Sequence, residues 1–122
     1  VHALSHVTGG GIAANLARVL PKGAWVEVDR ATWSPQPVFR VLCDLAGDSL
    51  ESTEGTWNLG IGMFAVVSAD AASAVISELD RLGHPAWVAG RVSTAAHDLT
   101  GFEQGAKGVD GGALQLVGSY RD

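Results

Sequence analysis

Apolar and polar residues alternate along several stretches of the chain, the pattern expected of strands with one buried face. Residues 25–29 read Trp-Val-Glu-Val-Asp and predict one strand, and residues 57–67 predict a stronger one. Shorter strands are expected at residues 2–7 and 85–92, and an edge strand at residues 114–117. The pattern therefore supplies four to five strands.

Three other stretches carry apolar residues at helical spacing. The first predicted helix covers about residues 9–20, the second starts at Ser34-Pro35 and ends at Gly47, and the third runs from Ser68 to Gly83. The apolar positions of the second helix are Val38, Val41, Leu42 and Leu45. The predicted buried stripe of the third comprises Ala72, Val75, Ile76, Leu79 and Leu82.

Three consecutive glycines begin the first predicted helix, in His6-Val7-Thr8-Gly9-Gly10-Gly11. Together they cost about 2–3 kcal/mol relative to alanines in a first turn, which suggests that something approaches the backbone closely. We expect Thr8 to be the N-cap and the N–H groups of Gly9, Gly10 and Gly11 to remain available for a phosphate or another anion. A tight crossing of the helix over a sheet is the alternative explanation.

Polar residues beside the glycines are further candidates, each with a structural alternative. His6 is placed to hydrogen-bond a phosphate or move a proton, or else serves the fold alone. Asn15 and Arg18 share a helix face with Gly11. They either extend an anion site or form a solvated polar face.

The predicted strand at residues 57–67 has one bare face, where Asn58, Gly60 and Gly62 alternate with apolar residues. Two glycines on one face indicate the close approach of a helix or of a ligand. The four tryptophans are spread along the chain and are expected in the core or at interfaces. Glu51 and Glu54 fall in a polar, turn-rich segment and are expected to be solvated.

Composition narrows the class of protein. The chain has 122 residues, 47% of them hydrophobic, and is expected to form a single domain, 1–122, with a loop-rich part at 93–112. A net charge of −5 disfavours general binding of nucleic acid or anionic membranes. Cys43 is the only cysteine, so we expect a reducing compartment and a buried, inert thiol. The histidines lack metal-ligand spacing, so no metal site is expected. The abrupt start inside a strand suggests a piece of a longer protein.

Five segments in order along the chain resemble one family. They are His6-Val7-Thr8-Gly9-Gly10-Gly11, Asn15-Leu16-Ala17-Arg18-Val19-Leu20-Pro21, Trp33-Ser34-Pro35-Gln36-Pro37-Val38-Phe39, Trp57-Asn58-Leu59-Gly60-Ile61-Gly62-Met63 and Gly90-Arg91-Val92. Collinear and similarly spaced, they resemble the C-terminal domain of phosphoribosylformylglycinamidine cyclo-ligase, also called aminoimidazole ribonucleotide synthetase. The resemblance covers residues 1 to about 93, followed by a variable tail.

The resemblance implies a fold and an activity. The fold would be an α+β, layered helix/sheet domain of partial ferredoxin-like topology, with about four to five strands and three main helices. The activity would be the ATP-dependent closure of the imidazole ring of formylglycinamidine ribonucleotide in purine synthesis, giving aminoimidazole ribonucleotide, ADP and phosphate. Magnesium, a cytoplasmic location and a homodimer of the full-length enzyme would accompany it. An N-terminal domain, not part of this sequence, would hold most of the ATP and magnesium contacts, so this piece alone is expected to be inactive.

The resemblance also assigns roles to residues. The turn from Thr8 to Gly11 would bind a phosphate at a cleft between the two domains. His6 and Asn15 would line that cleft in catalytic roles, and Asn58 would reach it from the neighbouring strand. Gly55 stands where the family usually has a basic residue, which leaves an anion contact at that position in doubt.

Two other functions fit the same residues. One is another ATP-dependent member of the superfamily, such as the amidotransferase, selenophosphate, thiamine-phosphate kinase or hydrogenase-maturation relatives. The other is a free-standing domain that binds a phosphate ligand or a partner without catalysis. The Thr8-to-Gly11 turn followed by Asn58 and its glycines favours the cyclo-ligase.

Overall fold

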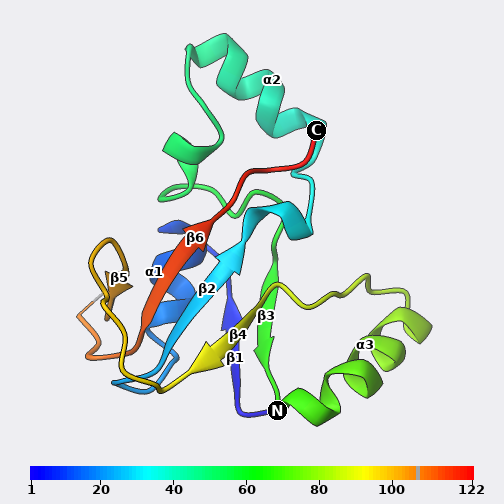
Figure 1. Ribbon diagram of the computed structural model, residues 1–122. Helices are drawn as coiled ribbons and strands as arrows, with labels where there is room; N and C mark the ends of the chain where they lie inside the picture. The colour runs from blue at the N-terminus through cyan, green and yellow to red at the C-terminus, as the bar shows by residue number, and fades with distance from the viewer. Residues whose placement is uncertain (107) are drawn as a thin grey trace.

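Six strands form two separate sheets in the computed structural model, which describes residues 1–106 and 108–122 (Figure 1). β1 (Ala3–His6) pairs antiparallel with β3 (Met63–Val66) as a two-stranded sheet. The larger sheet has the order β4-β2-β6-β5, formed by β4 (Gly90–Ser93), β2 (Trp25–Asp29), β6 (Ala113–Val117) and β5 (Glu103–Gln104).

Three α-helices and three short 3-10 helices complete the domain. The α-helices are α1 (Gly11–Ala17), α2 (Pro37–Ala46) and α3 (Ala72–Arg81). The 3-10 helices are η1 (Arg30–Thr32), η2 (Glu51–Thr53) and η3 (Ala69–Ala71). The expected α+β class is confirmed, with six strands in two sheets instead of four to five.

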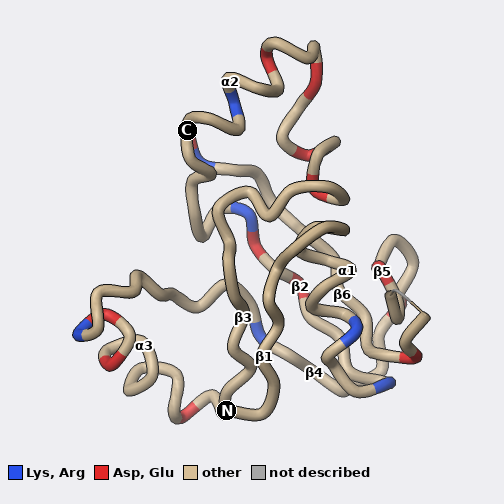
Figure 2. The backbone as a smooth tube through the Cα atoms, turned by 180° about the vertical axis from the view of Figure 1, so that it is seen from behind, with Lys and Arg blue, Asp and Glu red and all other residues tan. Residues whose placement is uncertain are grey.

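The main core lies between the four-stranded sheet and a layer made of α1 and the β1–β3 pair (Figures 1 and 2). Ile12 and Leu16 of α1 belong to this core together with Val26 and Val28 of β2. β2 forms where it was predicted because its side chains alternate: Val26 and Val28 are buried, whereas Glu27 between them is exposed.

The last strand, β6, is an inner strand of the larger sheet and not the edge strand that the sequence suggested. It runs parallel to β2 on one side and antiparallel to β5 on the other. Leu114 of β6 is fully buried in the main core. Alternation in a five-residue segment indicates a strand but not its place in the sheet, which is why the prediction erred.

The predicted strand at residues 57–67 is only half right. Residues 63–66 form β3, whereas residues 57–62 form an irregular turn with Leu59 at φ 48° and Gly60 at φ 93°. Positive φ at two successive residues is incompatible with a strand. The alternation of apolar and polar residues here comes from a turn that buries two side chains two residues apart, Leu59 and Ile61.

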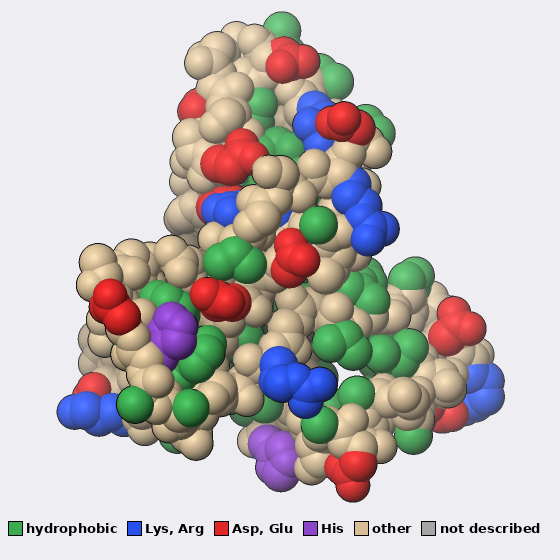
Figure 3. Space-filling model, viewed as in Figure 1, with side chains coloured by type: hydrophobic (Ala, Val, Ile, Leu, Met, Phe, Trp, Pro, Cys, Tyr) green, Lys and Arg blue, Asp and Glu red, His purple; other side chains and the backbone are tan. Residues whose placement is uncertain are grey.

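α2 and α3 stand away from the body of the domain (Figure 1). α2 begins at Pro37, two residues later than expected, and ends at Gly47 as predicted. Its inner side buries Cys43, as predicted for that thiol, in a second small core with Leu50 and Leu59. The predicted apolar stripe of α2 is instead exposed, comprising Val38, Val41, Leu42 and Leu45. Hydrophobic side chains therefore appear on the lobe at the top of Figure 3.

α3 buries none of its residues, so the predicted stripe on this helix is at most half-buried, and Leu82 just after it is exposed. Helical spacing predicts which residues share a face but not whether that face meets another element. No helix in the described part of the chain has the length and apolar character needed to cross a bilayer.

We predict that Leu114→Ala lowers the free energy of unfolding by about 2–5 kcal/mol, because a fully buried side chain in a central strand leaves a cavity. Urea denaturation measures the change. Val88→Ala, at an exposed position, is the control and should change stability by less than about 0.5 kcal/mol. An equally small effect at Leu114 would show that β6 is not part of the core.

Candidate functional site: the glycine turn and the loop beside it

The three glycines make a tight turn between β1 and α1. Gly10, at φ 99°, is the N-cap of α1, and Gly11, at φ 74°, is its first residue. Thr8 is therefore not the N-cap that the sequence suggested, because α1 starts two residues later than predicted. Its carbonyl oxygen instead accepts a hydrogen bond from the N–H of Gly11 at 3.2 Å, so that N–H group is not left over for a ligand.

Asn15 lies beneath this turn and holds its backbone. The side chain is fully buried, and its Nδ2 donates to the carbonyl oxygens of Gly11 at 2.7 Å, Thr8 at 3.2 Å and Gly9 at 3.4 Å. Asn15 therefore does not belong to a solvated polar face of the helix, which was one of the two alternatives for this residue. A buried amide bound to several carbonyls of one turn fixes the shape of that turn.

Gly11 also packs directly against a distant part of the chain. A Cβ built on Gly11 would overlap the carbonyl oxygen of Glu54, and the φ of 74° is itself unfavourable for any other residue. At Gly9, by contrast, an added Cβ would meet nothing within 4 Å. Close packing therefore explains Gly11, whereas the space above Gly9 is open.

The segment that touches Gly11 continues into the irregular turn at residues 57–62. There the Asn58 Oδ1 accepts a hydrogen bond from the N–H of Gly60 at 3.0 Å, which is an Asx turn. The carbonyl of Leu59, held at positive φ, accepts a hydrogen bond from the indole N–H of the buried Trp33 at 3.1 Å. These bonds hold a backbone conformation that a leucine rarely adopts.

A pocket of about 270 Å³ opens between the glycine turn and this loop. Its lining residues are Val7, Thr8, Phe39, Thr56, Trp57 and Asn58. Thr8 and Asn58, two of the predicted site residues, thus meet although 50 positions separate them in the sequence. Phe39 and Trp57 form an aromatic pair on its wall, with ring centroids 5.7 Å apart.

His6 does not line this pocket. It is the last residue of β1, exposed and paired across the sheet with Met63. Thr8 follows two residues later in the chain, beyond the end of β1. Among the predicted residues, the structure thus brings together Thr8, Asn58 and the turn held by Asn15, and His6 is not among the residues that line the pocket.

An ion pair that is largely shielded from solvent links the loop to the body of the domain. Both carboxylate oxygens of Glu54 are bound by Arg30, at 2.6 Å from Nε and 2.8 Å from Nη2. The hydroxyl of Tyr120 donates to the same carboxylate at 2.6 Å. The side chains of Arg30 and Glu54 are only 15% and 13% exposed. The prediction that Glu54 is solvated was therefore wrong.

The protonation states of this network follow from its geometry. The hydrogen bond to Glu54 raises the pKa of Arg30, although burial acts against it. Burial, and then the carboxylate of Glu54, raise the pKa of Tyr120 far above its ordinary value. At neutral pH Arg30 is therefore charged and Tyr120 is a hydrogen-bond donor.

The pocket itself is lined by neutral groups. No Lys or Arg is among its lining residues, and acidic residues follow one another along α2 and the segment after it (Figure 2). Across residues 1–106 and 108–122, no three His, Cys, Asp or Glu side chains gather as metal ligands would. An anion bound here would be held by hydroxyl, amide and backbone N–H donors.

Sequence reasoning missed Arg30, Glu54 and Tyr120, as well as Phe39 and Trp57 as pocket residues. Ion-pair partners 24 residues apart, and a hydroxyl 66 residues away, leave no local pattern. Both aromatic residues belong to segments that resemble the family. Trp57 directly precedes Asn58 in the sequence, and this position could have identified it as a pocket residue.

Comparison with known proteins places these residues in a family context. Residues 1–101 match the family described as "AIR synthase related protein, C-terminal domain". A putative phosphoribosylformylglycinamidine cyclo-ligase of Streptomyces fradiae is 41% identical over 120 residues, covering 98% of this chain and 61% of that protein. The phosphoribosylformylglycinamidine cyclo-ligase of Symbiobacterium thermophilum is 40% identical over 95 residues, and that of Pseudothermotoga lettingae 34% identical over 92 residues. Those matches cover 78% and 75% of this chain, and 27% of each relative. The chain thus spans between about a quarter and three fifths of these relatives.

We predict that Gly11→Ala destabilises the domain by about 2–4 kcal/mol, because it adds a left-handed backbone penalty to a clash with the Glu54 carbonyl. Gly9→Ala is the matched control, two residues away in open space, and should cost less than about 1 kcal/mol. Thermal and urea unfolding compare the two variants. Equal costs would contradict the packing role of Gly11.

Proposed function

Since the chain belongs to the AIR synthase related proteins, as their C-terminal domain, we propose that it is the substrate-facing part of an ATP-dependent phosphoribosylformylglycinamidine cyclo-ligase. The reaction would close the imidazole ring of formylglycinamidine ribonucleotide and release ADP and phosphate. The observation that carries the proposal is the pocket between the glycine turn and the loop of Asn58. Both of its walls lie within the region that matches the family.

The size and chemistry of this pocket support one end of a nucleotide as its ligand. Pockets that enclose a whole small molecule usually measure about 300–1,000 Å³, and this one is slightly smaller. Hydroxyl groups of Thr8 and Thr56 and the amide of Asn58 provide donors of the kind that bind phosphate and ribose oxygens. The remainder of the ligand would then be covered by another part of the enzyme.

Each candidate residue receives a role in this proposal. Thr8 would bind the phosphate group with its hydroxyl, together with the backbone of Gly9 and Gly10. Gly11 would only shape the turn, because its N–H donates to the Thr8 carbonyl. Asn58, whose Oδ1 is engaged with Gly60, would contribute its Nδ2 as a donor. Asn15 is buried, so it would act on catalysis through the shape of the turn. His6, exposed at the end of β1 and two residues before Thr8, would face the reacting end of the substrate.

The remainder of the activity would reside outside this chain. The curated relatives are much longer than the part that matches, and we assign the ATP and magnesium contacts to that additional region. The acidic and histidine residues described here form no metal cluster that would hold magnesium. A homodimer and a cytoplasmic location for the full-length enzyme belong to the same proposal.

We expect the 122-residue chain to bind the substrate ribonucleotide without turning it over. A 1H–15N NMR titration with formylglycinamidine ribonucleotide, and separately with ATP, would follow the backbone amides. The ribonucleotide should shift resonances around residues 9–11 and 56–58. An absence of shifts there at millimolar ligand, or ring closure by the isolated chain, would contradict the proposal.

The variant Thr8→Val removes one hydroxyl while keeping a β-branched side chain. Loss of one hydrogen bond to a charged group costs about 1.5–3 kcal/mol, so the Kd for the ribonucleotide should rise about tenfold or more. Thr94→Val, on the exposed loop after β4, provides the control and should leave the Kd unchanged. Unchanged binding by Thr8→Val would remove Thr8 from the site.

A further inference from the structure

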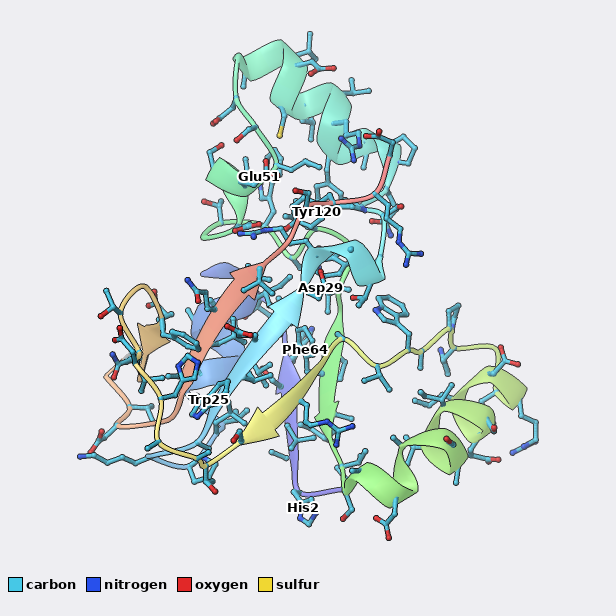
Figure 4. The ribbon with its side chains drawn as sticks, viewed as in Figure 1. His2, Trp25, Asp29, Glu51, Phe64 and Tyr120 are labelled. Carbon is cyan, nitrogen blue, oxygen red and sulfur yellow. The ribbon has the colours of Figure 1, made fainter. Side chains whose placement is uncertain are left out.

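The end of the chain reaches the candidate site from outside the region that matches the family. The family match ends at residue 101, whereas Tyr120 lies nineteen residues further on. After β6 the chain crosses toward α2, and Tyr120 lies between the end of β6 and the segment that follows α2 (Figure 4). Its ring packs edge-on against Trp33, with centroids 5.3 Å apart, and its hydroxyl donates to Glu54.

A single guanidinium joins this end of the chain to the loop beside the pocket. Arg30 binds the carboxylate of Glu54 through Nε and Nη2. Its Nη1 donates to the carbonyls of Leu116 at 2.9 Å and Gly118 at 3.1 Å. Three segments that are far apart in the sequence, at η1, at Glu54 and at the C-terminal end of β6, therefore meet at one residue.

Glu54 is connected to both walls of the pocket, through its backbone carbonyl on one side and through the chain that follows it on the other. Its backbone carbonyl packs against Gly11, the last glycine of the turn and the first residue of α1. The chain then continues into Thr56, Trp57 and Asn58, which form the opposite wall. The N–H groups of Thr56 and Trp57 both donate to the carbonyl of Thr53 at 2.9 Å, so the segment is short and stiff. A shift of Glu54 would thus change the separation of the two walls.

We propose that Tyr120 is a positioning residue, which acts through Glu54 and Arg30 to set the spacing between Thr8 and the wall at Thr56–Asn58. It touches no ligand itself, because it is not among the residues that line the pocket. This inference rests on the proposed function for the identity of the ligand. The segment after residue 101 is then part of the binding apparatus and not a variable tail.

The test compares Tyr120→Phe with Ser52→Ala in the 122-residue chain. Tyr120→Phe removes only the hydroxyl that binds Glu54 and keeps the ring that packs on Trp33. Ser52→Ala removes a hydroxyl bound to a different carboxylate, that of Asp48, in the 3-10 helix just before Glu54. The first measurement, without ligand, records the 1H–15N amide shifts of both variants. The second measures the Kd for formylglycinamidine ribonucleotide and for inorganic phosphate, at a temperature below the onset of thermal unfolding of both variants.

We expect Tyr120→Phe to shift the amide resonances of residues 8–11 and 56–58 in the absence of ligand. We also expect it to raise the Kd about threefold to tenfold, the change that corresponds to the loss of one hydrogen bond. Ser52→Ala should do neither. Lower thermal stability with unmoved amides and unchanged Kd would overturn the inference, since it would show a structural role alone. If the unmodified chain binds neither probe, the proposed function fails, and the ligand-free amide shifts still decide whether Tyr120 sets the spacing.

Discussion

The arrangement of the site depends on the largely buried ion pair between Arg30 and Glu54. Burying two charges is costly, and the cost is recovered only where the geometry is good and the remaining polar atoms are bound. Here both carboxylate oxygens are bound by the guanidinium, a tyrosine hydroxyl adds a third hydrogen bond, and the remaining guanidinium donor binds two backbone carbonyls. A satisfied network of this kind specifies one arrangement of the segments that it joins.

The glycine turn is the second half of the same arrangement. Asn15 fixes its backbone from below, and Gly11 has no side chain because the carbonyl of Glu54 occupies that space. The two explanations that the sequence left open for the glycines therefore apply to different residues. Gly11 serves packing, whereas Thr8 lines the pocket that we propose for a phosphate-bearing ligand, and an added Cβ at Gly9 would meet nothing within 4 Å.

The sequence predicted what depends on local pattern. The alternation at Trp25 to Asp29 and the glycine after α2 placed β2 and the end of that helix correctly. The collinear motifs indicated the family and the pairing of the glycine turn with Asn58. Contacts between distant segments could not be read in this way. Glu54 has its partners 24 and 66 residues away, and the central position of β6 depends on pairing with both β2 and β5.

The most direct test of this account is a double-mutant cycle between Arg30→Gln and Glu54→Gln, measured as free energies of unfolding in urea. If the pair holds these segments together, each single variant leaves a buried charge unpaired, and the coupling energy should reach at least about 1.5 kcal/mol. Costs that add to within about 0.5 kcal/mol would show independent side chains. The ion pair would then not be the interaction on which the site depends.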